Sequence, residues 1–241
     1  MPRQSDLRFT FEPLQGDVFE VVSFTLDEGL SRPFKLTLEL ASHNAAIDFN
    51  RVLDLAGLFM IWRGDTPVRH VHGLVSLFTQ GDTGFRRTRY TAVVEPTLAR
   101  FNLRSNWRIF QGQTVPDIIK AVLGEFGITF EAKLTGTYTA LDYCVQHDET
   151  SFEFISRLME GAGIFYFFTF KDGAHTMVLA DASTAHVACT DATTVRFYPE
   201  TGAEHMIDTI ASFELENRLV ALKHSQGDYD PLKPSTALDA S

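Results

Sequence analysis

The fold is decided by a stretch near the middle of the chain, which reads Tyr143-Cys144-Val145-Gln146-His147-Asp148-Glu149-Thr150-Ser151-Phe152-Glu153-Phe154-Ile155-Ser156-Arg157-Leu158 and continues as Glu160-Gly161-Ala162-Gly163-Ile164-Phe165-Tyr166-Phe167-Phe168. Thr150 followed by Glu153 is typical of a capping box at the start of a helix. The apolar residues after it recur at helical spacing. Gly163 favours the helix end, and the aromatic run that follows predicts a strand. The order is therefore strand, capped helix, glycine, strand.

The same pattern occurs once before in the chain. Thr114 precedes Pro116 and Asp117, which predicts a second N-cap with a proline in the first helical turn. The apolar stripe that follows is Ile118, Ile119, Val122, Leu123 and Phe126, and the glycine is Gly127. We expect both helices to pack on one face of a small sheet, with their apolar stripes facing it, as an α+β layer.

Residues 7 to about 96 show the alternation of strands with one buried face. Leu36, Leu38 and Leu40 alternate with polar residues, and two long strands are expected on either side of a turn at Gly81-Asp82-Thr83-Gly84. Several strands with short turns and almost no helix predict a closed or nearly closed antiparallel barrel. Strand-like character returns at Val195–Tyr198 and Ile207–Leu215.

The composition limits the possible partners. A net charge of −10 argues against nucleic acid and against stable association with an anionic membrane. The 21 phenylalanines favour dry cores or dry interfaces. The two cysteines do not make a disulfide framework. We expect a protein made in the cytoplasm, which would leave the cell only by a route without a cleaved signal, because Met1–Asp6 has no apolar run.

Four groups of residues are candidates for functional sites. His70 and His72 share one face of a strand and could begin a metal site, but no third ligand is evident. His147-Asp148-Glu149 directly precedes the Thr150 cap, where acids favour the positive helix end. Cys144 and His147 lie on opposite faces of their strand, which argues against a thiolate–imidazole pair. The last group, in a glycine-containing loop, consists of Glu200, Glu204 and His205.

Motifs of a catalytic nucleophile or of a phosphate-binding loop are absent from the sequence. We therefore predict no catalytic, cofactor-binding or metal-binding residues, no cofactor, and a protein that is not an enzyme. A metal- or ligand-binding barrel built around His70 and His72 stays open as a less favoured alternative, which metal analysis of the untagged protein would test.

Several blocks resemble one family in their order along the chain. They are Glu28-Gly29-Leu30-Ser31-Arg32-Pro33-Phe34, then Arg108-Ile109-Phe110-Gln111 with Val115-Pro116-Asp117-Ile118-Ile119, then the stretch from Tyr143 to Asp181. This order resembles the N-terminal hub region of VgrG, the spike protein of the type VI secretion system, which is homologous to the baseplate hub of contractile phage tails. His147 stands where the family often has an aromatic residue, and Gly161-Ala162 replaces acids.

The resemblance implies a structural role. Family members form a homotrimer whose barrels make a ring that docks on the tail-tube hexamer of Hcp, while the α+β domain faces baseplate proteins. The spike is exported or injected by the secretion apparatus. The alternative is the hub of a phage tail baseplate, which has the same fold.

Residues and resemblance together predict a mainly β, α+β protein with four parts. They are a tube-docking antiparallel β-barrel over residues 1–103, an α+β domain with two capped helices over 104–188, a partial second β-barrel over 189–225, and a linker or disordered tail over 226–241. Because the second barrel is only begun, we expect a truncated protein that trimerises weakly or not at all, with a folded core over residues 7 to about 185.

Overall fold

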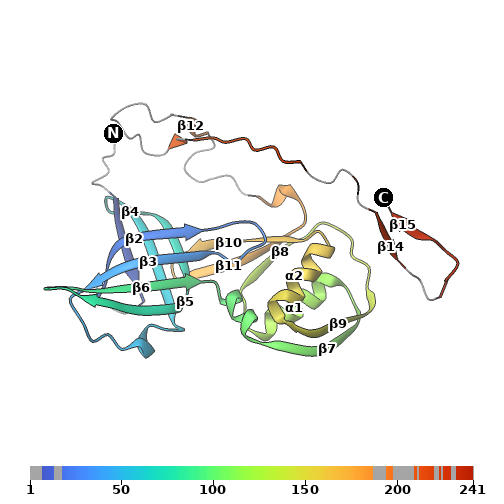
Figure 1. Cartoon of the computed structure of the whole chain (residues 1–241), viewed down its shortest axis with the longest axis horizontal. Helices are drawn as coiled ribbons and strands as arrows, with labels where there is room; N and C mark the ends of the chain where they lie inside the picture. Colours follow the sequence, from blue (N-terminus) through green and yellow to red (C-terminus); the bar gives the residue numbers. More distant parts are fainter. Residues whose placement is uncertain are drawn as a thin grey trace. The chain divides into compact units, whose positions relative to one another are not determined.

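The computed structural model describes residues 7–13, 18–186, 194–197, 209–210, 212–219, 223, 225–228 and 232–240. The chain forms two compact units, residues 1–188 and residues 189–241, and each is described by itself. The first unit contains a barrel-like sheet and an α+β layer (Figure 1).

The barrel-like sheet has six antiparallel strands in the order β1-β4-β5-β6-β3-β2. Their bounds are Leu7–Glu12 for β1, Glu20–Asp27 for β2, Lys35–Ser42 for β3, Ala56–Arg63 for β4, Thr66–Thr83 for β5 and Thr88–Glu95 for β6. The sheet curls into a half-barrel (Figure 1). Its two edge strands, β1 and β2, approach each other through the rings of Phe9 and Phe24, whose centroids are 5.1 Å apart. Aromatic side chains, rather than a hydrogen-bonded ladder, thus bring the two edges together.

The alternation in the sequence places the core of this sheet correctly. Leu36, Leu38 and Leu40 are fully buried, and they pack with Phe59 and other apolar side chains on the concave side. The expected hairpin turn at Gly81-Asp82-Thr83-Gly84 was wrong by a few residues. Strand β5 continues to Thr83, which pairs with Thr88 after a register shift, and the Gly84 amide donates to the Arg87 carbonyl at 2.9 Å.

The α+β layer combines two helices with a ribbon and a small sheet. The ribbon pairs β7 (Ser105–Gln113) with β9 (Leu141–Thr150), and the sheet has the order β10 (Phe165–Lys171), β11 (Ala174–Ala180), β8 (Phe130–Lys133). The helices are α1 (Val115–Glu125) and α2 (Ser151–Gly161). Elsewhere in the first unit, 3-10 turns occur between β3 and β4 (η2, Phe49–Arg51), between β6 and β7 (η3, Thr97–Leu103) and after β11 (η4, Ser183–Ala185).

Both helices begin and end as their sequences predict. Thr114 and Thr150 are the N-caps, and Thr150 forms a full capping box with Glu153. Gly127 and Gly163 have φ values of 65° and 67°, a conformation that glycine adopts without strain. The next residue after each glycine donates its amide back to the helix, Ile128 to Leu123 at 3.1 Å and Ile164 to Met159 at 2.8 Å, as in a Schellman motif.

The predicted apolar stripes form the core of this layer. Ile118, Ile119, Val122 and Ile155 are fully buried and Leu158 is 8% exposed, whereas Phe126 is only partly buried. They pack in one cluster with Tyr166, Met177 and Leu179 of β10 and β11. The helices therefore cover the small sheet, as expected.

The barrel-like sheet and the α+β layer meet where β10 and β11 lie beside β5 (Figure 1). Phe34 makes edge-on contacts with Phe168 and Phe170, at centroid distances of 5.3 and 5.0 Å. The Ser31 amide donates to the Tyr166 carbonyl at 2.8 Å. The residues of the Glu28–Phe34 motif thus join the two parts of the unit.

In the second unit the structure describes two strand pairs. β12 (Arg196–Phe197) pairs parallel with β13 (Thr209–Ile210), and β14 (Gln226–Asp228) pairs antiparallel with β15 (Leu238–Ala240). The last pair lies inside the range expected as linker or tail. The four-part division, including a second barrel over 189–225, stays a prediction. Within the described residues, no helix has the length and apolar character needed to span a bilayer.

Candidate functional site

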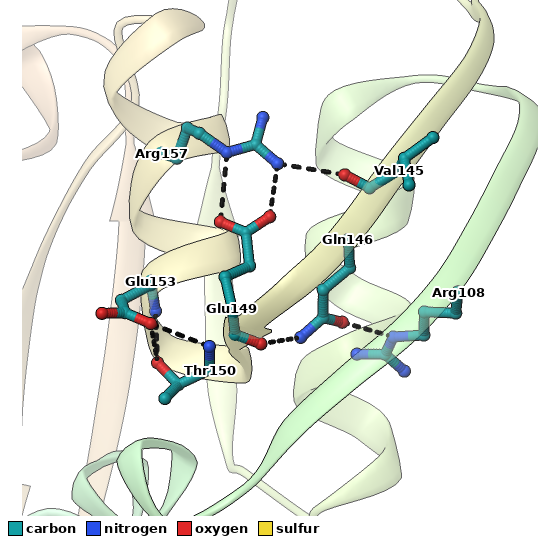
Figure 2. A network of polar contacts seen from close by, with 7 residues as sticks. All are labelled: Arg108, Val145, Gln146, Glu149, Thr150, Glu153 and Arg157. Carbon is teal, nitrogen blue, oxygen red and sulfur yellow. Dashed lines mark hydrogen bonds and ion pairs between the residues drawn. The ribbon is translucent and has the colours of Figure 1, made fainter.

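The cluster His147-Asp148-Glu149 lies at the end of β9, directly before the N-cap of α2. The Glu149 carboxylate receives two hydrogen bonds from Arg157 of α2, at 2.6 Å from Nη2 and 3.2 Å from Nε (Figure 2). Arg157 Nη2 also donates to the Val145 carbonyl at 3.1 Å. A bidentate carboxylate–guanidinium pair holds both side chains in one geometry. Glu149 is therefore occupied in holding the strand to the helix.

A second chain of hydrogen bonds extends this network to β7 and α1. Gln146 is fully buried, and its Nε2 donates to the Glu149 carbonyl at 2.9 Å while its Oε1 accepts from Arg108 Nε at 2.7 Å (Figure 2). Arg108 Nη1 then donates to both carboxylate oxygens of Glu125 at 2.7 Å. A buried polar side chain needs such partners to offset its loss of water. The network fixes the inner face of the ribbon against both helices.

The remaining members of the cluster point elsewhere. The His147 ring contacts Trp107 with centroids 3.9 Å apart, and Asp148 is exposed with a φ of 51°. Glu153 receives the Thr150 amide at 2.8 Å, and this bond lowers the pKa of its carboxyl. The three consecutive residues do not converge on one point, so their geometry offers no general acid–base pair.

Cys144 and His147 lie on opposite faces of β9, as predicted. Cys144 is buried in the core of the α+β layer, and His147 is exposed. Burial raises the pKa of the Cys144 thiol, which keeps it in the less reactive protonated form.

The structure brings His72, but not His70, to another histidine. His72 Nδ1 lies 3.0 Å from His175 Nδ1, which joins β5 of the barrel-like sheet to β11 of the α+β layer. The Nε2 atom of His175 accepts the Thr97 amide at 3.3 Å. Burial and the charge of His72 lower the pKa of His175 to about 4, and burial lowers the pKa of His72.

These contacts assign the protons on both rings. Because the Thr97 amide is a donor, His175 Nε2 must be an acceptor, and the neutral ring carries its proton on Nδ1. That proton is donated to His72, so His72 accepts at Nδ1 and carries its own proton on Nε2. A metal ion between the two Nδ1 atoms would displace this proton and demand further ligands. Among the described residues, no group of three or more His, Cys, Asp or Glu side chains could hold a metal ion.

Two candidate sites remain, the group around His205 and an apolar groove beside η3. Glu200, Glu204 and His205 lie outside the described residues. A groove of about 510 Å³ lies beside η3 and is lined mainly by apolar side chains, among them Leu53, Leu77 and Leu103. The Arg100–Asp54 ion pair lies at its wall. This lining is suited to contact with an apolar surface.

Sequence reasoning missed the partners that come from distant parts of the chain. His175 follows His72 by 103 positions, and Arg108 precedes Gln146 by 38. The one available signal was the position of Gln146, a polar residue at an inward-facing place on an apolar strand, which requires a buried partner.

Comparison with known proteins places this geometry in a family. The model of the phage tail baseplate hub (GPD) family matches residues 27–241. The chain is 39% identical over 235 residues to the type VI secretion system spike protein VgrG2a of Pseudomonas aeruginosa, which is 97% of this chain and 28% of the relative. VgrG2b of the same organism is also 39% identical, and the match covers 97% of this chain and 23% of that protein. The chain thus spans about a quarter of the length of these relatives.

Solved structures agree with this assignment. An Escherichia coli protein, c3393, described as a component of the type VI secretion system similar to the T4 tail proteins gp27 and gp5, matches with a TM-score of 0.70 and 25% identity over 80% of this chain and 53% of that one. A prophage tail protein of Shewanella oneidensis shares the fold, with a TM-score of 0.52 and 15% identity over 79% of this chain and 58% of its own. The chain therefore belongs to the phage tail baseplate hub family.

Proposed function

We propose that this chain is the hub region of a type VI secretion spike, in which three copies form a ring that docks on the Hcp tail-tube hexamer. The observation that carries the proposal is the 39% identity to VgrG2a over 97% of this chain. A match that extends over nearly the whole chain supports a shared set of interfaces rather than one shared motif.

The arrangement of the described side chains supports a non-enzymatic role. In the polar network around Gln146 and Glu149, the hydrogen bonds of Arg108 and Arg157 join the ribbon to the two helices, although Arg108 Nη2 is buried without a partner. In this proposal the function resides in surfaces that contact the tube and the baseplate. The spike would be assembled in the cytoplasm and exported by the apparatus itself.

The proposal can be tested with a chimera in which this chain replaces the matching N-terminal region of VgrG2a. Purified chimera and P. aeruginosa VgrG2a would be titrated against immobilised Hcp hexamers, with the phage-type tail-tube protein of a contractile prophage as the comparison. We expect one trimer to bind one Hcp hexamer. A folded, trimeric chimera that fails to bind Hcp would contradict the proposal.

A phage tail baseplate hub is the second candidate, favoured by the family model that matches residues 27–241. The same experiment separates the two functions, because a phage hub would bind the prophage tube protein and not Hcp. The genes beside the natural open reading frame, whether of a secretion cluster or of a tail cluster, provide an independent check.

A further inference from the structure

At the junction between the barrel-like sheet and the α+β layer, a continuous series of hydrogen bonds links three groups. The Thr97 amide donates to His175 Nε2 at 3.3 Å, and His175 Nδ1 lies 3.0 Å from His72 Nδ1. His72 belongs to β5 of the barrel-like sheet, and His175 belongs to β11 of the α+β layer. Thr97 begins η3, which follows β6 and whose Leu98 and Phe101 pack in the core of the α+β layer. His175 is thus hydrogen-bonded across the junction through Nδ1 and to the segment that follows β6 through Nε2.

The surroundings of His175 are mainly aromatic. The rings of Phe34 and Phe168 lie 6.0 and 6.1 Å from its centroid. The charged and titratable residues that lie nearest to the pair along the packed strands are Arg69 and His70 of β5, Glu95 at the end of β6, and Lys171 of β10. Arg69 is paired with Glu28. Among the described residues, His72 is the group whose charge lowers the pKa of His175.

We propose that the His72–His175 pair is an acid-operated latch that holds the barrel-like sheet to the α+β layer at neutral pH and releases it when either ring is protonated. The latch belongs to the fold itself and does not depend on the proposed secretion role.

Protonation breaks this series of hydrogen bonds at a defined atom in each case. A proton on His175 Nε2 occupies the lone pair that accepts the Thr97 amide. A proton on His72 Nδ1 occupies the lone pair that accepts from His175, and the two N–H groups then face each other across 3.0 Å. Either event leaves a half-buried donor without its acceptor, which is unfavourable in this apolar junction. The neutral form of both rings is the form that the closed junction requires.

The direction of the pH effect follows from these protons. The pKa of His175 is about 4 in the closed junction, against an ordinary value of 6.5. An opened junction returns the ring to water, so opening takes up a proton between pH 6.5 and 4. The closed state is therefore fully favoured above pH 6.5 and loses stability as the pH falls through this window, by up to about tenfold per pH unit for one proton.

Hydrogen exchange of the full chain, measured by NMR between pH 7.5 and 4.5, tests the latch. The amides of Thr97 and Ser31 report on the junction, and the Ile128 amide, which closes α1, is the internal reference. After correction for intrinsic exchange, we expect protection of the first two to fall relative to Ile128 below pH 6.5. The ring nitrogens at pH 7.5 should show His175 protonated on Nδ1 and His72 protonated on Nε2.

Two variants separate titration from packing. His175→Asn does not titrate, and its amide can either donate to or accept from His72 Nδ1, so protection should become nearly independent of pH. His70→Gln leaves the pair intact and should keep the wild-type dependence. Equal pH dependence in wild type and His175→Asn would overturn the proposal. If His175→Asn does not fold, the wild-type protein still provides a test. His175 protonated on Nε2 and His72 protonated on Nδ1 at pH 7.5 would overturn the proposal.

Discussion

At the scale of single residues, the helix stripe Ile118 to Phe126 and its counterpart Ile155 to Leu158 carry the packing of the α+β layer. Spacing alone predicted that these residues would be buried, and the structure confirms it for all except Phe126, which is partly exposed. His175 could not be predicted in the same way, because its partners come from β5 and η3, and long-range contacts leave no mark in the local pattern.

Replacing Leu158 by Ala should destabilise the first unit by roughly 2–5 kcal/mol. Leu158 of α2 is 8% exposed and lies in the apolar cluster that the two helices form with β10 and β11, so truncation removes apolar contacts and leaves a cavity. The measurement is chemical denaturation followed by circular dichroism. Leu103→Ala is the matched control, since Leu103 is 85% exposed and should change the unfolding free energy little. Identical denaturation of Leu158→Ala and wild type would show that the packing assignment is wrong.

At the scale of elements, sequence reasoning succeeded where the signal is local and failed where strand pairing decides the position of a turn. The caps and glycine stops of α1 and α2 depend on residues a few positions apart, and both were predicted. The β5–β6 turn was misplaced because Gly81-Asp82-Thr83-Gly84 has turn composition, yet β5 continues through it by a register shift and pairs Thr83 with Thr88. Pairing with β6 outweighs local propensity there.

Two glycine substitutions of opposite effect test the strand packing. A Cβ added at Gly73 of β5 would lie 2.5 Å from the Glu95 carbonyl oxygen of β6, so Gly73→Ala should force the strands apart and destabilise the sheet by roughly 1–3 kcal/mol. Gly124 is exposed in α1 with open space around its Cα, so Gly124→Ala should stabilise by up to about 1 kcal/mol. Thermal unfolding would show whether the two variants shift in opposite directions. A stabilised Gly73→Ala would contradict the close approach of β5 and β6.

At the scale of the whole molecule, the described interfaces are internal, and the outward ones are those of the proposed function. The first unit has its own two cores, one in the barrel-like sheet and one in the α+β layer. Under the proposed function three copies form one ring, so we expect the VgrG2a chimera to form a stable trimer.

The molar mass of the VgrG2a chimera, measured by light scattering over a hundredfold range of concentration, tests this account most directly. The mass of three chains at every concentration is the predicted result. A folded chimera that stays a monomer would contradict the assignment of this chain to a trimeric hub.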